Sequence, residues 1–318
     1  MSLCAKACAH RQTTHPRTDD HDARHGWEPN YARVVNVARL SLTPLKGTAH
    51  ESLKAVSLDL EGPRHDRRFC LVDPARARVL RTVENPALVS CQARYDGTSL
   101  AVRLPDGSTV VDVVGDRVAQ LEVDYWGRRA AVHVISGPWA RAFSALLAQE
   151  VLLAEVDRPG QVVFGGSVTL LTTSSLRELA ARLGRVLDGE ALLVDSERFR
   201  STVAVDTGTA SAFVEDSWVG REITLGAATV RVRGPVPRCA VVRLRPRDGR
   251  QERPDPLRAL AWDRTEVNER GREVVFGVDA QVVRPGVVRV GDPVTAGQGT
   301  CLLSATDSVC PGDVAVRH

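Results

Sequence analysis

One cysteine of the chain, Cys239, occurs in a sequence context that suits chemistry. It follows a proline-rich stretch and lies between Arg238 and Arg243. Neighbouring guanidinium groups stabilise a thiolate, which is the form of cysteine that binds metals and attacks sulfur. The context therefore predicts a reactive thiol. A free cysteine is also often a small buried hydrophobic residue, so local spacing alone leaves both interpretations open.

The stretch before this cysteine predicts a β-hairpin that would present it. Residues 222–233 form two strand-like runs around Gly226, which suits a tight turn. Pro235 and Pro237 cannot donate hydrogen bonds within a sheet, so we expect the second strand to end near Gly234. The short apolar run after the cysteine would then begin a new strand.

A second candidate site lies where a predicted strand, residues 168–172, meets a predicted helix. The capping pattern Ser175-x-x-Glu178 predicts the start of this helix. Thr173 and Ser174 lie at the junction, where free backbone N–H groups and the helix dipole attract phosphate. Plain capping of the helix explains one such hydroxyl equally well, so anion binding and capping both remain open.

The segment 195–200 is dense in charge and offers further anion donors. If it is extended, Arg198 and Arg200 point to the same side of the chain. Paired guanidinium groups suit a phosphate or a metal-bound oxyanion. The alternative is a solvated face on which Asp195 and Glu197 neutralise the two arginines.

Length and composition limit the class of protein. The 318 residues suit one large or two ordinary domains, and 43% hydrophobic with 25% charged residues is typical of a soluble globular protein. A net charge of +3 gives no reason to expect nucleic-acid binding. The 7 cysteines are odd in number and irregularly spaced, which favours reduced thiols over a disulfide framework.

The sequence carries no targeting or membrane signal that we can identify. No apolar run is long enough to predict a membrane-spanning segment. The N-terminus lacks the apolar core of a secretory signal, and Asp19, Asp20 and Asp22 argue against a mitochondrial transit peptide. We therefore expect a cytoplasmic protein. Residues 1–33 are polar without hydrophobic periodicity, which predicts disorder.

Short strands dominate the rest of the pattern. Between residues 34 and 125, strand-like runs alternate with Gly and Pro turn signals, which predicts a small barrel or curled sheet. Residues 126–160 contain one predicted helix, with Pro138 as its first residue. Residues 276–294 return to strands.

Five motifs, in this order along the chain, resemble those of the MOSC superfamily, the domain type found at the C-terminus of molybdenum cofactor sulfurases. The resemblance covers roughly residues 34–295. It is strongest to members that carry an additional N-terminal β-barrel domain, the amidoxime-reducing proteins and their bacterial relatives among them. The motifs are PLKG (Pro44–Gly47), DRRFCLVD (Asp66–Asp73), ERFR (Glu197–Arg200), GPVPRC (Gly234–Cys239) and FGVDAQVVRPGVVRVGDPV (Phe276–Val294).

The resemblance implies a fold and a domain organisation. The fold would be mainly β with a few helices. An N-terminal MOSC β-barrel domain would span residues 34–125, a β-barrel-like MOSC domain residues 126–295, and a C-terminal tail residues 296–318. The molybdenum cofactor, a molybdenum–molybdopterin, would lie in the cleft between the two domains because its implied contacts come from both.

The resemblance also implies roles for residues at matching positions. Cys239 would be the catalytic residue and a ligand of the metal. Thr202 stands where the family commonly has Asn, and it lacks the paired donor and acceptor of an amide. The implied cofactor-binding residues are Lys46, Arg67, Thr173, Ser174, Arg198, Arg200, Thr202 and Arg238.

The implied activity is that of a molybdenum-dependent oxidoreductase. It would reduce N-hydroxylated small molecules by oxygen-atom removal at molybdenum, with electrons from a separate haem or iron–sulfur protein. Outside the N-terminal extension only His50, His65 and the more distant His133 precede the C-terminal residue, so acid–base chemistry is thinly supplied and a cofactor would bring the reactivity. Two alternatives remain open: a sulfur carrier or sulfurtransferase that uses a Cys239 persulfide, and a non-catalytic carrier of the molybdenum cofactor.

Overall fold

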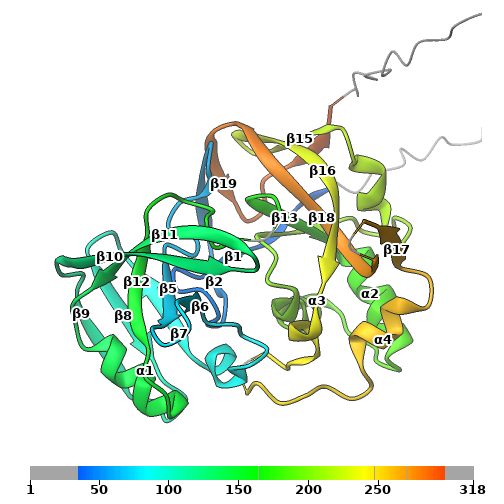
Figure 1. Ribbon diagram of the computed structural model, residues 1–318. Helices are drawn as coiled ribbons and strands as arrows, with labels where there is room; N and C mark the ends of the chain where they lie inside the picture. The colour runs from blue at the N-terminus through cyan, green and yellow to red at the C-terminus, as the bar shows by residue number, and fades with distance from the viewer. Residues whose placement is uncertain (1–34, 164, 247, 270, 298–318) are drawn as a thin grey trace, which may run out of the picture. The chain divides into compact units, whose positions relative to one another are not determined.

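The computed structural model describes residues 35–163, 165–246, 248–269 and 271–297. The predicted disorder of residues 1–33 and most of the predicted C-terminal tail lie outside the described residues. The described chain consists mainly of β-strands with a few short helices, which confirms the predicted fold class (Figure 1). Within this part of the chain, no helix is long and apolar enough to cross a membrane.

Strands dominate the first half of the described chain, as the Gly and Pro punctuation predicts. Its helix begins directly after Pro138 and buries Trp139 and Phe143, as the apolar periodicity predicts. The elements are β1 (Asn36–Leu42), β2 (Glu51–Leu53), β3 (Ala55–Asp59), β4 (Gly62–Pro63), β5 (Phe69–Asp73), β6 (Arg78–Val79), the 3₁₀ helix η1 (Pro86–Ser90), β7 (Gln92–Tyr95), β8 (Ser99–Arg103), β9 (Thr109–Val113), β10 (Arg117–Tyr125), β11 (Arg128–Ile135), α1 (Trp139–Leu147) and β12 (Leu152–Val156).

The second half alternates strands with short helices. The predicted hairpin around Gly226 is present as β15 and β16. The elements are β13 (Val168–Thr172), α2 (Thr173–Arg182), α3 (Gly189–Asp195), η2 (Ser196–Phe199), β14 (Val203–Asp206), η3 (Val214–Trp218), β15 (Glu222–Leu225), β16 (Ala228–Arg238), η4 (Ala240–Arg243), α4 (Pro256–Ala261), β17 (Thr265–Asn268), β18 (Gly271–Arg284), β19 (Gly286–Arg289) and β20 (Val294–Ala296).

A nine-stranded sheet combines strands from both ends of the described chain. Its strands lie in the order β2-β1-β14-β13-β18-β16-β15-β20, and β17 pairs with β18. β13 and β14 are parallel, so the chain between them must cross over the sheet, and it does so through α2, α3 and η2. This crossover is important for the site because it carries Arg198 and Arg200.

Strands β10, β11, β12, β5 and β6 close into a barrel (Figure 1). β5 is buried on both of its faces: Phe69 and Leu71 pack into one hydrophobic core, and Cys70 and Val72 pack into another. This two-sided burial explains why β5 reads as an unbroken apolar run. β1 and β3, in contrast, pair with β14 and β19 of the second half. The domain boundary at residues 125 and 126 stays a prediction.

Two predictions around Cys239 are wrong. β16 does not end near Gly234 but continues to Arg238, because β-bulges shift its register against β18. The prolines are tolerated because they lie beyond Ala228–Arg231, the segment of β16 that pairs with β15. The run after Cys239 is not a strand but the 3₁₀ helix η4, and Cys239 is its N-cap residue.

Two predictions about the crossover are also wrong. The charged segment 195–200 is helical rather than extended, because Asp195 and Arg198 can form an ion pair across one helical turn. Helix α2 begins three residues earlier than its Ser175 capping pattern suggests. Thr172 is its N-cap, and the Thr172 hydroxyl accepts a hydrogen bond of 3.3 Å from the Ser175 amide.

Gly277 of β18 fixes the close approach of this strand to β13. Its φ is 69°, and a Cβ there would lie 2.3 Å from Leu171 Cδ2 and 2.6 Å from the Leu170 carbonyl oxygen. We expect Gly277→Ala to lower the free energy of unfolding by about 2 to 4 kcal/mol, because it adds overpacking to left-handed backbone strain. Urea unfolding would measure this change.

The matched control is Gly234→Ala in β16, where the described residues leave open space around an added methyl group. This variant should change the free energy of unfolding by less than about 1 kcal/mol. Equal effects of the two substitutions would contradict the packing role of Gly277.

Candidate functional site

Cys239 lies where β16 ends and the chain turns into η4. As the N-cap of this short helix it has an extended backbone conformation. Its side chain is exposed and its thiol is free. The described chain contains two further free cysteines, Cys70 and Cys91, but both are buried, and burial raises the pKa of each thiol to about 12. Among the described cysteines, Cys239 is therefore the one accessible to a ligand.

Two of the sequence motifs, PLKG and DRRF, lie side by side next to this thiol. The Lys46 amide donates to the Phe69 carbonyl at 2.8 Å, and the Phe69 amide donates to the Pro44 carbonyl at 2.8 Å. The Arg67 amide donates to the Thr43 carbonyl at 2.7 Å. These backbone hydrogen bonds hold Lys46 and Arg67 close together although the two residues belong to separate loops.

Arg200 reaches the same place from the second half of the chain. Its Nη1 donates to the Thr48 carbonyl at 2.8 Å, and Arg67 Nη2 donates to the Arg200 carbonyl at 3.4 Å. Both arginines have left-handed backbone conformations, with φ of 47° at Arg67 and 55° at Arg200. Such a conformation costs a non-glycine residue about 1 to 3 kcal/mol, and it is found preferentially at functional sites.

Arg238 completes the set from the residue before the cysteine. Its Nε donates to the Phe276 carbonyl at 2.8 Å, and its Nη1 donates to the Phe199 carbonyl at 2.8 Å. The guanidinium lies 5.4 Å from the centre of the Phe199 ring. These contacts fix the Arg238 side chain. We refer to Lys46, Arg67, Arg200 and Arg238 as the cation cluster.

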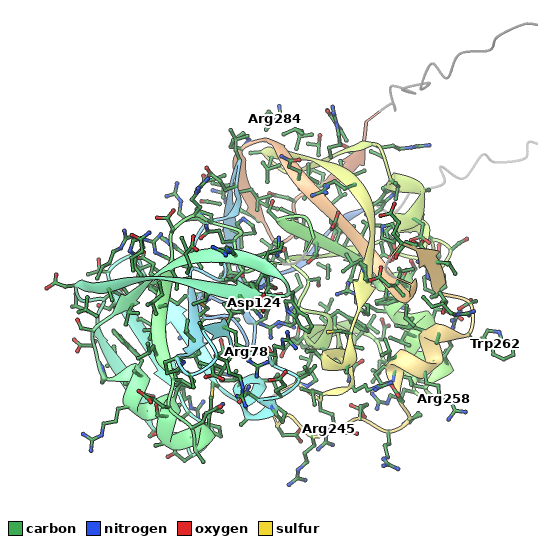
Figure 2. The ribbon with its side chains drawn as sticks, in the orientation of Figure 1. Arg78, Asp124, Arg245, Arg258, Trp262 and Arg284 are labelled. Carbon is green, nitrogen blue, oxygen red and sulfur yellow. The ribbon has the colours of Figure 1, made fainter. Side chains whose placement is uncertain are left out.

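The cation cluster concentrates positive charge beside the thiol. Cys239 interacts electrostatically with Lys46, Arg200 and Arg238. Burial, together with the charges of Arg200 and Arg67, lowers the pKa of Lys46 to about 8. Burial also lowers the pKa values of Arg200 and Arg238, although guanidinium groups remain protonated at neutral pH. Other arginines, such as Arg245, point outward (Figure 2).

Two donors of the cation cluster lack acceptors. Nη2 of Arg200 and Nη2 of Arg238 are buried and have no hydrogen-bond partner among the described residues. Leaving a buried charged donor unsatisfied is costly, so each such nitrogen requires an explanation. Both arginines interact electrostatically with Cys239, so an anion bound beside this thiol would offset their positive charge. The residues therefore fit an anionic cofactor.

Sequence analysis missed one member of the site, Tyr125. Its side chain is buried, and its ring centre lies 5.1 Å from Lys46 Nζ and 5.1 Å from Arg128 Cζ. Burial raises the pKa of Tyr125, and its hydroxyl interacts electrostatically with Arg67 and Cys239. No sequence pattern distinguishes this tyrosine, because it is simply the last residue of β10.

Thr173 and Ser174 bind the neighbouring strand end rather than the cation cluster. The Thr173 hydroxyl donates to Asp206 at 2.9 Å and accepts from the Thr207 amide at 3.2 Å. The Ser174 hydroxyl accepts from the Thr207 hydroxyl at 3.0 Å. The structure thus shows no contact between these two residues and Cys239 within the described chain, and their role in cofactor binding stays a prediction.

Thr202 has a comparable position inside the sheet. Its amide donates to the Thr169 hydroxyl at 3.0 Å, and its own hydroxyl accepts from the Thr169 amide at 3.3 Å. Thr202 is buried, and these reciprocal bonds tie β13 to the end of the crossover. Its assignment to the cofactor likewise stays a prediction.

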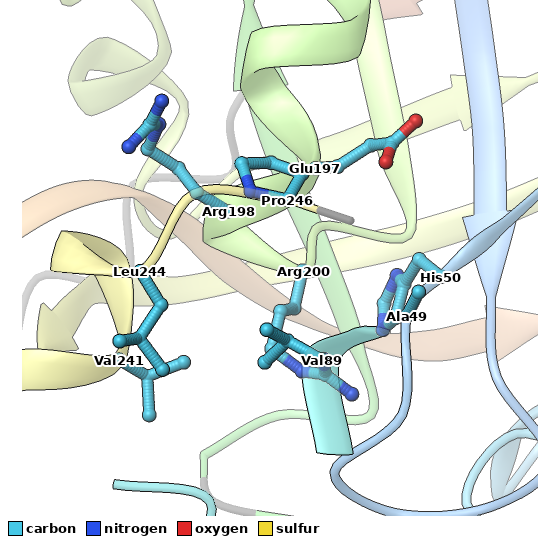
Figure 3. A pocket seen from close by; sticks show the side chains of 9 residues that line it. All are labelled: Ala49, His50, Val89, Glu197, Arg198, Arg200, Val241, Leu244 and Pro246. Atoms are coloured by element: carbon cyan, nitrogen blue, oxygen red, sulfur yellow. The ribbon is translucent and has the colours of Figure 1, made fainter. Parts of the chain in front are cut away.

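Arg198 and Arg200 diverge although only one residue separates them. Arg198 is buried and bonded to Asp195 and Glu252, with the Glu252 distance at 3.1 Å. Asp195 thus pairs with Arg198 as the sequence alternative expects, but Arg198 is buried rather than solvated, and Glu197 pairs with Arg39 instead. Figure 3 shows the two arginine side chains pointing in opposite directions around a small pocket that His50 also lines. The pocket has a volume of about 20 Å³, which is room for about one water molecule.

The described chain combines a closed β-barrel with a nine-stranded sheet, and Cys239 directly follows strand β16 of that sheet. Comparison with known families identifies the class of protein to which this arrangement belongs. Residues 34–149 match the MOSC N-terminal beta barrel domain, and residues 157–295 match the MOSC domain. The chain therefore belongs to the MOSC superfamily, in the form that carries the N-terminal β-barrel domain, which confirms the resemblance seen in the sequence. This membership supports a function related to the molybdenum cofactor.

Similar proteins include mitochondrial amidoxime-reducing component 1 from Homo sapiens, which is 23% identical over 85% of this chain and 87% of its own length. The Mus musculus protein of the same name is 29% identical over 39% of this chain and 35% of its own length. Among solved structures, the YuaD protein from Bacillus subtilis has a TM-score of 0.39 and 13% identity, covering 83% of this chain and 95% of that one. This TM-score is too low to bear on the fold or the function.

Arg200→Asn should remove the response of the protein to anions with little loss of stability. Asn tolerates the left-handed conformation, and removal of a crowded cation offsets the lost hydrogen bond to Thr48. We expect the free energy of unfolding without ligand to change by less than about 1 kcal/mol. Sulfate should raise the Tm of the cofactor-free wild type but not that of the variant.

Arg198→Gln is the matched comparison, because it removes an arginine from the same motif. It breaks buried ion pairs to Asp195 and Glu252, so we expect a loss of about 3 kcal/mol in stability and an unchanged sulfate response. A sulfate response that disappears in Arg198→Gln would instead favour the sequence-based assignment of Arg198 to the cofactor. A response retained in Arg200→Asn would contradict the anion site.

Anion binding should weaken as Lys46 loses its proton. Because the pKa of Lys46 is lowered to about 8, the ammonium is charged below this pH and neutral above it. We expect the affinity of the cofactor-free protein for sulfate, whose charge is constant here, to fall about tenfold between about pH 7 and pH 9. In Lys46→Arg the cation persists, so the profile from calorimetric titration should be flat. Parallel profiles in the two proteins would show that another group titrates.

Proposed function

We propose that the cation cluster and Cys239 hold a molybdenum cofactor and that the protein is a reductase of N-hydroxylated small molecules. The observation that carries this proposal is the pair of buried, unsatisfied nitrogens on Arg200 and Arg238 beside an exposed thiol. A phosphorylated, thiolate-ligated cofactor supplies both an anion for the guanidinium groups and a soft metal for the sulfur. Membership of the MOSC superfamily supports the same assignment.

Each residue would have a distinct task. Cys239 would bind the metal through its sulfur, and Arg238, the preceding residue, would lie beside that bond. Lys46, Arg67 and Arg200 would bind the phosphate and other anionic groups of the cofactor, with Arg67 and Arg200 rigidly held by their backbone contacts. Thr173, Ser174, Arg198 and Thr202, which the family resemblance also assigns to the cofactor, would support this arrangement from the crossover.

The cofactor, when bound, supplies a metal centre that removes an oxygen atom from an N–OH group at the expense of two electrons. The chain's own residues bind and orient this group. Lys46, whose pKa is lowered to about 8, is a cation that can also release a proton near neutral pH. The name of the human relative, an amidoxime-reducing component, supports N-hydroxylated substrates.

The partners of this reaction are part of the proposal. A small-molecule substrate must reach the exposed side of Cys239, and a separate haem or iron–sulfur protein would deliver electrons. The family resemblance is the reason for proposing a separate electron-donor protein. The small net charge of the chain gives no reason to propose nucleic acid as a further partner. We propose a cytoplasmic location on the basis of the sequence, whereas the similar human protein is named as mitochondrial.

The exposure of Cys239 also favours a second candidate function, sulfur transfer. A persulfide on an accessible cysteine beside cations would be held as the anion and could be passed to an acceptor after a separate desulfurase had loaded it. A carrier that binds the molybdenum cofactor without turning over any substrate is the non-catalytic variant of the proposal. Metal content and activity distinguish the three functions.

The decisive test is the metal content of wild type and Cys239→Ala, expressed together in a host that makes the cofactor. We expect about one molybdenum per wild-type chain and at least a several-fold lower content, or an altered metal spectrum, in the variant. Lack of molybdenum in both proteins would refute cofactor binding, and a mass increase of one sulfur on Cys239 would then favour sulfur transfer. Stoichiometric molybdenum without reduction of a benzamidoxime probe by any reductant would favour the carrier.

A further inference from the structure

A buried histidine, His50, lies beside the cation cluster and has no role in the function proposed above. Its side chain lines the small pocket next to Arg200 (Figure 3). His50 Nε2 lies 3.3 Å from Arg67 Nη2, and His50 Nδ1 lies 3.3 Å from the Ser41 hydroxyl. The imidazole therefore connects an arginine of the cluster to β1.

The hydrogen bonds around Ser41 determine which nitrogen of His50 carries the proton. The Ser41 hydroxyl donates its hydrogen to the Ser201 carbonyl at 2.7 Å, so its oxygen can only accept a hydrogen bond from His50. The proton of His50 must then be on Nδ1, which leaves the lone pair of Nε2 to accept from Arg67. Ser41 and Ser201 thus select the tautomer that binds Arg67.

Burial and the neighbouring positive charges keep the His50 imidazole in its neutral form. Burial is the largest cause, and the charges of Arg200, Arg67 and Arg39 add to it, so that the pKa of His50 lies well below its ordinary range. A protonated imidazole would have no lone pair for Arg67 and would repel three guanidinium groups. Neutral His50 is the form that stabilises the cluster.

The contacts of Arg67 show what His50 controls. Arg67 Nη2 donates to His50 and to the Arg200 carbonyl, and Arg67 Nη1 donates to Asp66. These bonds use three of the five N–H groups of the guanidinium, and two remain for a ligand. His50 is therefore one of three acceptors, with Asp66 and the Arg200 carbonyl, that fix the orientation of the Arg67 guanidinium.

We propose that His50 is a positioning residue of the anion site: its Nε2 accepts a hydrogen bond from Arg67 and orients the free N–H groups of that arginine toward the phosphate of the bound ligand. The Ser41 hydroxyl and the Ser201 carbonyl complete the device by fixing the tautomer. The inference rests on the proposed function in that Arg67 is a ligand of the anionic cofactor. It adds a residue that acts through Arg67 without contact with the ligand.

Two substitutions of His50 distinguish the role of Nε2 from that of Nδ1. Gln places an amide oxygen near the position of Nε2 and keeps an acceptor for Arg67, whereas Asn places its amide near Nδ1 and loses that acceptor. The probe is inorganic pyrophosphate, titrated by calorimetry into the full-length chain prepared without cofactor. We expect His50→Asn to weaken binding about fivefold and His50→Gln to stay within about twofold of wild type. Ser41→Ala, which keeps the histidine but frees its tautomer, should weaken binding as well.

A double-mutant cycle with Arg67→Gln tests whether His50 acts through Arg67. In the Arg67→Gln background, His50→Asn should cause no further loss of pyrophosphate affinity, whereas a general structural defect would persist there. Equal losses in His50→Asn and His50→Gln, or an undiminished loss in the Arg67→Gln background, would overturn the inference. Should His50→Asn not fold, Ser41→Ala in both backgrounds decides the same question. The molybdenum content of wild type, measured separately, decides the proposed function, so the two can fail independently.

Discussion

The structure depends on a concentration of positive charge that the described carboxylates neutralise only in part. Cys239 interacts electrostatically with Lys46, Arg200 and Arg238, and Arg67 forms an ion pair with Asp66. Charges of the same sign at short range in a low-dielectric region repel strongly. Under the proposed function, an anionic ligand would turn this repulsion into attraction. Nη2 of Arg200 and Nη2 of Arg238 are also buried without an acceptor among the described residues, which is a second cost in the absence of a ligand.

Backbone geometry, rather than side-chain packing, holds these charges together. The PLKG and DRRF motifs pair through amides and carbonyls, which places Lys46 beside Arg67. Arg67 and Arg200 adopt left-handed conformations, so their side chains leave the chain in directions that a strand or helix would not allow. Gly277 leaves space for Arg238, since an added Cβ would approach its Nη2 to 3.3 Å. The strained backbone at Arg67 and Arg200 can therefore hold like-charged side chains together in spite of their mutual repulsion.

Sequence reasoning predicted the fold class, the hairpin before Cys239 and the strand β13, because apolar periodicity and turn residues are local signals. It failed where tertiary contacts decide. β16 continues past two prolines because bulges against β18 accommodate them, and no local rule reports a bulge. The segment 195–200 is helical rather than extended, and Arg198 pairs there with Glu252, which is distant in sequence, as well as with Asp195. Of the candidate site, the motifs supplied Lys46, Arg67, Arg200, Arg238 and Cys239. Tyr125 and His50 gain significance only through residues far away in sequence.

The departure of this chain from the family at Thr202 gains a physical interpretation from the contacts of this residue and of its neighbour Ser201. The Thr202 hydroxyl is bonded to the Thr169 amide, and the Ser201 carbonyl accepts from Ser41. Ser201 thus contributes through its backbone, which any residue could provide, and Thr202 stabilises the sheet. The change of residue type therefore affects a residue that supports the sheet at the end of the crossover. Arg200, which precedes Ser201, remains in the cation cluster. A site held by backbone geometry can tolerate such replacements because the residues that carry charge are positioned independently of them.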